Sequence, residues 1–254
     1  MQAFIAVTPE EEREAARHHL PLAHVAYRLG EDSSLLRRNL LLQTRGGLLS
    51  VSDRDAPAVG DPGALCAAVL RECGRREYQG VLLDFEAPPR PDLMRLVRLL
   101  GERLPAARRT LYVPEGYASA APHAPVLCNS AVSGGSWIEY LRENVQRLGP
   151  GRLALDLERV RMDFSLPSPT GHGTPLTGQE LARLMEREAP AVFFSPELCA
   201  RYFTYTRSGE THFILFDDGE TLRRKLRAAA SLGCAAAFLM WPEIQDIAGT
   251  LFPA

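Results

Sequence analysis

Two carboxylates end a short apolar segment in the first half of the chain. The segment Tyr78–Glu86 (YQGVLLDFE) closes on Asp84-Phe85-Glu86. Side chains two residues apart on a strand point the same way, so Asp84 and Glu86 share a face with Phe85 buried behind them. Carboxylates this close repel each other, which raises one pKa and leaves a group able to act as a general acid. The alternative is that both acids only end the strand before the 87–90 loop, with Arg90 as partner.

Strand and helix patterns alternate along the rest of the chain. Helical spacing and capping residues predict helices beginning near Thr8-Pro9 and at Asp61-Pro62 (to about Arg76), Pro91–Leu104, Trp137–Leu148, Thr177–Glu188 and Gly219–Leu232. Apolar or alternating runs predict strands at Gln2–Val7, Leu22–Arg28, Asn39–Gln43, Tyr78–Glu86, Arg109–Pro114, Pro125–Asn129, Arg152–Leu157, Ala191–Ser195 and Ala235–Trp241.

Strands separated by helices indicate a parallel sheet with helical crossovers. At 254 residues the simplest solution is an α/β fold of the (β/α)8 TIM-barrel type, as one domain over residues 1–254. Tyr202–Thr206 and His212–Asp217 predict a small β-hairpin inserted before the last helix. A doubly wound open sheet is the alternative. In a barrel, Asp84 and Glu86 would lie at the carboxyl-terminal mouth, where such enzymes place their reactive groups.

Composition excludes several classes of protein. The chain is 46% hydrophobic with a formal net charge of -2, which argues against disorder and gives no electrostatic footprint for nucleic acid or an anionic membrane. The 5 cysteines form no C-x-x-C pair, and no phosphate-binding loop occurs, so we expect no metal and no cofactor. The amino terminus lacks the pattern of a signal peptide, which predicts synthesis in the cytoplasm.

Two segments resemble family 18 glycoside hydrolases. YQGVLLDFE is similar to the catalytic strand of that family, roughly D-G-x-D-x-D-x-E. The block Tyr202–Glu243 is similar to the end of its barrel, most of all in the branch of spore-germination and cortical-fragment-lytic enzymes. In that branch the last helix also carries a lysine, here Lys225, the single lysine of the chain, which indicates a local packing or pairing role. The block Gly151–Phe164 keeps little of the family motif.

The resemblance implies hydrolysis of β-linked N-acetylglucosamine glycans by a retaining, substrate-assisted mechanism. Glu86 would be the acid and base, Asp84 would orient the acetamido group, and Trp241 would form a floor under the sugar. Peptidoglycan is favoured over chitin because of the germination-like block, and spore association follows from the same block. No nucleic acid, membrane or obligate protein partner is indicated.

Departures from the family pattern keep a second function open. Leu82 stands where the family has an aspartate next to Asp84, and Asn129 falls where a tyrosine holds the acetamido group. Asn129 could donate through its amide with a different reach, or Tyr112 or Tyr117 could substitute, so we expect these three and Trp241 to be the substrate-binding residues. Loss of one such donor costs about 10²–10³ in rate. The alternative function is therefore a weak or inactive relative that binds glycans or acts as a scaffold. Glu115, just past a strand end, is a reserve candidate for the site.

Overall fold

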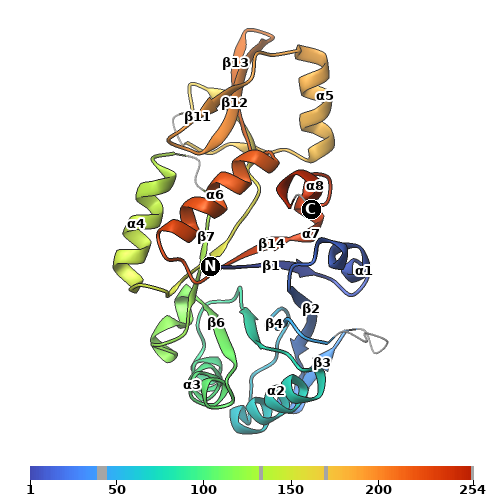
Figure 1. Ribbon diagram of the computed structural model, residues 1–254, viewed down its shortest axis with the longest axis vertical. Coiled ribbons are helices and arrows are strands. Elements are labelled where there is room, and N and C mark those ends of the chain that lie inside the picture. Colours follow the sequence, from blue (N-terminus) through green and yellow to red (C-terminus); the bar gives the residue numbers. More distant parts are fainter. Residues whose placement is uncertain (39–44, 132–133, 169–170, 253–254) are drawn as a thin grey trace.

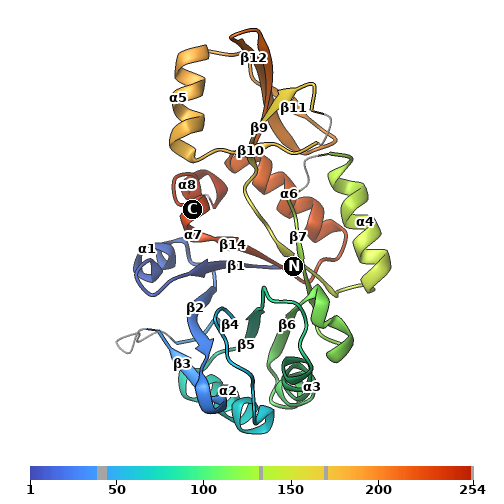
Figure 2. The same ribbon diagram turned by 180° about the vertical axis from the view of Figure 1, so that it is seen from behind.

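The computed structural model describes residues 1–38, 45–131, 134–168 and 171–252. Within these ranges, eight parallel strands follow the order β1-β14-β8-β7-β6-β5-β4-β2, and the pairing of β1 with β2 closes the barrel (Figures 1 and 2). The predicted (β/α)8 barrel is confirmed. The strands are β1 (Gln2–Val7), β2 (Leu22–Leu29), β4 (Leu48–Ser52), β5 (Gly80–Asp84), β6 (Thr110–Pro114), β7 (Val126–Asn129), β8 (Leu153–Asp156) and β14 (Ala236–Met240).

Helices surround the barrel and begin where the sequence offers caps. Asp61 accepts a hydrogen bond from the Ala64 amide (2.9 Å) at the start of α2, and Asp218 accepts one from the Thr221 amide (2.8 Å) at the start of α6. The α-helices outside the barrel are α1 (Glu12–Ala15), α2 (Pro62–Arg76), α3 (Pro91–Ala106), α4 (Trp137–Leu148), α6 (Gly219–Ser231), α7 (Trp241–Ile244) and α8 (Ala248–Leu251), and the 3-10 turns are η1 (Ala16–His18), η2 (Glu31–Ser33) and η3 (Glu115–Ala120).

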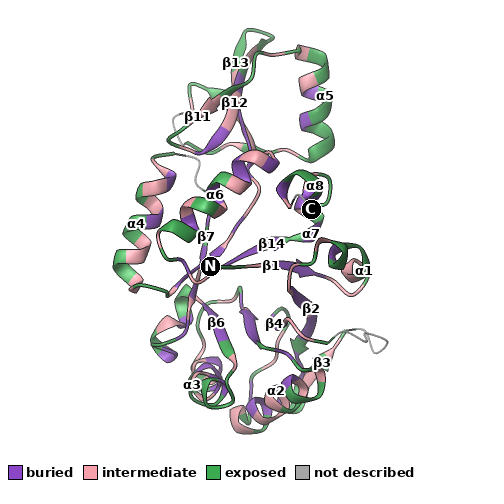
Figure 3. Cartoon of the chain, viewed as in Figure 1, coloured by how far each residue is buried: buried purple, intermediate pink, exposed green. Residues whose placement is uncertain are grey.

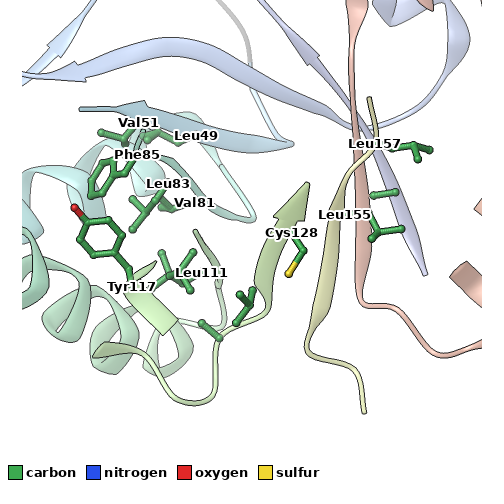
Figure 4. Close-up of a cluster of buried hydrophobic side chains, with 14 of the residues drawn as sticks. Leu49, Val51, Val81, Leu83, Phe85, Leu111, Tyr117, Cys128, Leu155 and Leu157 are labelled. Carbon is green, nitrogen blue, oxygen red and sulfur yellow. The ribbon is translucent and has the colours of Figure 1, made fainter. Parts of the chain in front are cut away.

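Alternate residues of each strand belong to two different cores. Along β5, Val81 and Leu83 pack outward against the helices, together with Phe85 just after the strand (Figure 4). Leu82 belongs instead to the cluster inside the barrel, with Phe4, Tyr112 and Phe238 among others. The strands are accordingly buried on both faces, whereas the outer helices expose one side (Figure 3). Asp84 follows Leu82 by two residues and therefore points toward the barrel axis.

An inserted unit separates β8 from α6. Its antiparallel sheet has the order β10 (Thr174–Pro175), β9 (Arg161–Leu166), β13 (Glu210–Phe216), β12 (Ala200–Arg207), β11 (Phe193–Ser195). The predicted hairpin is the β12–β13 pair, so that prediction is confirmed, and the sheet around it extends further. Helix α5 (Gly178–Glu188) covers one face, where its Leu181 and Leu184 meet Phe203 and Ile214. The unit stands beyond the barrel rim in both views (Figures 1 and 2).

Two strand predictions need comment. Asn39–Gln43 lies outside the described residues, and the third barrel strand is β4, which follows Gly46-Gly47 and was not predicted. The strand predicted at Ala191–Ser195 is present at Phe193–Ser195, but it does not belong to the barrel. That segment is the edge strand β11 of the inserted sheet, and its Phe193 is 54% exposed. The short strand β3 (Leu35–Arg37) pairs antiparallel with β2 and lies outside the closed barrel.

Candidate active site

Asp84 and Glu86 lie together at the carboxyl-terminal mouth of the barrel. Asp84 ends β5 half-buried, and Glu86, two residues on, is exposed. Both line one cavity of about 570 Å³, whose other walls come from β2, β3 and the end of β4. Phe85, between them, is buried on the outer side of the strand against Tyr117, with ring centroids 5.4 Å apart (Figure 4). The strand therefore presents both carboxylates to one open pocket.

Asp53 fixes the turn that carries Glu86. This aspartate follows β4 and is 5% exposed. Its carboxylate accepts hydrogen bonds from the backbone amides of Glu86 (2.9 Å) and Ala87 (3.2 Å). A buried carboxylate that satisfies two backbone amides holds them rigidly, so the main chain at Glu86 is preorganised without using the Glu86 side chain. The sequence prediction missed Asp53, although SVSD ends in an acid much as VLLD does.

Burial and mutual repulsion perturb the acids at this mouth. The pKa of Asp84 is raised, first by burial and then by the charges of Glu86 and Asp53, against a lowering by Arg54. Burial also raises the pKa of Asp156 to about 6, aided by Glu158, Glu243 and Asp84. Carboxyl groups held partly protonated near neutral pH are typical of sites that transfer protons. The predicted rise of one pKa in the D-x-E pair accordingly falls on Asp84.

Asp156 is a site residue that the sequence prediction missed. It ends β8, and the same strand's Ala154 lies in the inner cluster, so Asp156 also faces the mouth. The signal was present, because Asp156-Leu157-Glu158 repeats the acid–apolar–acid spacing of Asp84-Phe85-Glu86. Leu82 stands where the resembling family has an aspartate next to Asp84. The carboxyl group that interacts electrostatically with Asp84 here is Asp156 on β8, whose pKa the charge of Asp84 helps to raise.

Replacing Asp156 by asparagine should stabilise the fold in a pH-dependent way. The pKa of native Asp156 is about 6, whereas in the unfolded chain the same carboxyl group has its ordinary pKa of 3.8. The native state binds more protons between these values, so this group's stabilisation is present in acid and is lost as the pH rises to 6. Above pH 6 we expect the free energy of unfolding of Asp156→Asn to be about 1–3 kcal/mol higher than that of the wild type. Urea titrations at pH 4 and 7.5 measure this, and a difference that is equal at both values contradicts it.

Asn129 and Tyr112 lie on neighbouring barrel strands but do not line the cavity of Asp84 and Glu86. Asn129 ends β7 beside Asp156, and one of its amide protons is donated to Glu158. Its side-chain oxygen accepts from the Ala131 amide (2.7 Å). Tyr112 pairs with Leu82 in register, one layer deeper than Asp84, and its ring packs edge-on against Phe238 (5.1 Å).

Trp241 and Tyr117 are not brought together with the carboxylates. Trp241 is 2% exposed, begins α7 and contacts His18, with ring centroids 5.4 Å apart. Met240, in phase with the inward Phe238, takes the place at the mouth and is 36% exposed. Tyr117 lies in η3, is 1% exposed and packs outside the barrel. Neither aromatic ring lines the cavity of Asp84 and Glu86.

Three alternative features find no support within the described ranges: an ion pair between Arg90 and the carboxylates, a metal site, and a helix that spans a membrane. Arg90 donates to the carbonyl oxygens of Ala56 (3.1 Å) and Pro57 (2.9 Å) and to Asp92 (3.2 Å), so it forms no ion pair with Asp84 or Glu86. Among the residues that the structure describes, no group of three or more His, Cys, Asp or Glu side chains has the geometry of a metal site. In the same residues no helix is long and apolar enough to span a membrane.

Solved structures with the same fold include a spore cortex-lytic enzyme and chitinases. No protein-family model matches the chain, and no curated protein sequence matches it. The spore cortex-lytic enzyme SleL of Bacillus cereus superposes with a TM-score of 0.70 at 16% identity, over 99% of this chain and 74% of that one. The likeness is one of fold. A Chromobacterium violaceum chitinase matches with a TM-score of 0.69 at 15% identity over 98% of both chains. A GH18 chitinase from Cycas revoluta, solved in complex with (GlcNAc)3, matches with a TM-score of 0.66 at 15% identity, over 99% of this chain and 97% of that one.

Proposed function

We propose that the protein is a glycoside hydrolase of the family 18 type that cleaves β-linked N-acetylglucosamine glycans, with peptidoglycan fragments favoured over chitin. The observation that carries the proposal is the pair Asp84 and Glu86, side by side in one open cavity at the carboxyl-terminal mouth of the barrel. Solved chitinases and cortex-lytic enzymes with the same barrel support it. The raised pKa values of Asp84 and Asp156 support it as well, because buried acids without a catalytic use are costly.

The proposed mechanism divides the work between the two carboxyl groups. Glu86 donates its proton to the glycosidic oxygen as that bond breaks, while the acetamido oxygen of the substrate attacks the anomeric carbon. Asp84 accepts the acetamido N–H and stabilises the positive charge of the oxazolinium that forms. Water then attacks the anomeric carbon and gives its proton to Glu86, which restores the acid. Asp53 keeps the Glu86 main chain in place throughout, through its two amide contacts.

Turnover of defined glycans tests this function. Oligomers of N-acetylglucosamine and solubilised peptidoglycan strands would be incubated with the protein, and new reducing ends would be counted. We expect release from at least one of the two substrates, at a rate that follows enzyme concentration. A protein that neither cleaves nor binds either glycan contradicts the proposal.

A second candidate function is a glycan-binding protein built on a hydrolase barrel. Two observations favour it. Leu82 is an apolar residue inside the barrel, and the side-chain amide of Asn129 donates to Glu158, so neither residue is available to hold the acetamido group. Saturable glycan binding by calorimetry, with no reducing ends released over a day, would support this candidate instead of the enzyme. The retained Glu86 has no structural partner among the described side chains that would explain it in a pure binder.

A further inference from the structure

Arginines line the cavity that also contains Asp84 and Glu86. Arg28 near the end of β2, Arg38 just after β3 and Arg54 after β4 all line the cavity that holds Asp84 and Glu86. All three side chains are exposed. Within the described ranges none of the three forms an ion pair or side-chain hydrogen bond with a carboxylate, whereas Arg201 pairs with Asp218 and Glu220, and Arg224 pairs with Glu220.

Apart from Asp55, which directly follows Arg54 in the chain, the charged residues named here lie on two sides of the cavity. The arginines come from β2, β3 and the loop after β4, while Asp84 and Glu86 come from β5. Several guanidinium groups that line one side of a cavity give that side a positive potential, which attracts an anion. Arg54 and Asp84 line the same cavity, and the charge of Arg54 lowers the pKa of Asp84, against the larger effect of burial. A ligand that spans it would meet carboxylates at one end and guanidinium groups at the other.

The described residues that line this cavity present no exposed aromatic ring on which a sugar could stack. Neutral sugars usually bind through their C–H faces on exposed aromatic rings. Tyr27 is the aromatic residue among the described lining side chains, and it is 4% exposed. Its hydroxyl is bonded to Glu72 (2.8 Å) and Tyr78 (3.0 Å), which fixes the ring edge-on in the outer core. Affinity in this cavity must therefore come from charge more than from stacking.

We propose that the cavity binds a glycan whose sugars carry carboxylates, with Arg28, Arg38 and Arg54 as the anion-binding wall. The inference rests on the proposed function, since it places the scissile bond at Glu86 and a neighbouring sugar on the arginine side. Guanidinium groups bind carboxylates through paired, charge-assisted hydrogen bonds, which gives both affinity and orientation. Two kinds of glycan supply that chemistry: the lactyl carboxylate of N-acetylmuramic acid, and the ring carboxylate of a uronic acid.

The test compares specificity constants on matched substrates. Oligosaccharides of equal length would be used: neutral N-acetylglucosamine oligomers, alternating N-acetylglucosamine and N-acetylmuramic acid, and alternating N-acetylglucosamine and glucuronic acid. We expect at least a tenfold preference for one of the carboxylate-bearing substrates, and which one identifies the source of the carboxylate. The preference should decline as salt screens the arginines. Equal or better turnover of the neutral oligomer overturns the inference.

Variants of the wall separate this inference from the function it rests on. Arg28→Gln combined with Arg38→Gln should reduce the ratio of anionic to neutral kcat/KM at least tenfold, and Arg142→Gln, an exposed arginine on α4, should leave both constants unchanged. If the ratio stays at the wild-type value, the arginines do not form an anion-binding wall. If no substrate is cleaved, calorimetry with the same oligosaccharides decides: arginine-dependent binding of the anionic glycan upholds the wall while the hydrolase proposal fails, and equal binding of all three glycans overturns it.

Discussion

Glu86→Gln is expected to reduce turnover by about 10²–10⁴-fold, the usual contribution of a general acid. Glutamine has the size of glutamate but has no acidic proton to give to the glycosidic oxygen. The side chain of Glu86 is exposed, and its backbone amide is held by Asp53, so the substitution removes chemistry and leaves the fold intact. Reducing-end release from the best substrate measures the loss, and the unfolding midpoint in urea should stay at the wild-type value.

Glu115 provides the matched control. It follows the next barrel strand, β6, is also exposed, and forms an ion pair with Arg147 (2.5 Å) away from the cavity. Glu115→Gln should retain wild-type turnover within about twofold. If Glu86→Gln keeps its activity, or if Glu115→Gln loses it, the assignment of the acid to Glu86 is wrong.

Lys225→Met is expected to have the largest effect on stability. The Lys225 ammonium lies 2.7 Å from the Asp217 carboxylate, and the two side chains are 1% and 0% exposed. Asp217 also accepts from the Val160 amide (3.0 Å) and the Thr221 hydroxyl (2.9 Å). Removing one partner of a buried pair leaves the other charge uncompensated and costs about 3–5 kcal/mol. The pairing role predicted for the single lysine matches this contact.

This ion pair joins the barrel to the inserted sheet. Asp217 follows β13 of the inserted sheet, and Lys225 lies on α6 of the barrel. Urea unfolding measures the cost, with Arg224→Met on the same helix as control. Arg224 makes an exposed pair with Glu220 (2.6 Å), so its removal should cost no more than about 1 kcal/mol. Equal losses in the two variants would contradict the role of the buried pair.

Periodicity predicted most of the barrel because its strands and helices follow simple patterns. β1 and α4 have the bounds that were expected, and Asp61 caps α2 as its position before Pro62 indicated. The strand β4 was missed because its LLSVS sequence carries two serines, one of them Ser50 at 1% exposure. A serine inside a buried strand looks like a turn residue until its neighbours are known.

The inserted sheet could be predicted only in part. Its hairpin has a clear turn at Arg207–Glu210, whereas β9 (RMDFSL) and β11 (FFS) mix polar and apolar residues with no sustained period. Strands of this kind gain their structure from pairing with distant segments. β9 pairs with β13 along its whole length, although the two strands are far apart in the sequence.

The proposed catalytic pair followed from its spacing in the sequence, but the positions of the residues around it did not. Asp84 and Glu86 need only the two-residue repeat of one strand. Whether Trp241 faces the mouth depends on the end of β14, where a shift of one residue exchanges inward and outward positions. The structure turns Met240 inward and buries Trp241 against His18. Asp156 needed the position of β8 in the barrel, which the repeated D-x-E spacing alone did not fix.

The configuration of the first product tests the central claim most directly. A substrate-assisted reaction at Asp84 and Glu86 inverts the anomeric carbon twice, so a β-linked substrate must first release the β-anomer. Proton NMR of a fresh digest, recorded before mutarotation equilibrates the anomers, distinguishes the two outcomes. We predict that the β-anomer signal rises first and the α-anomer follows only by mutarotation. Initial release of the α-anomer would contradict the mechanism, because it requires a single displacement by water.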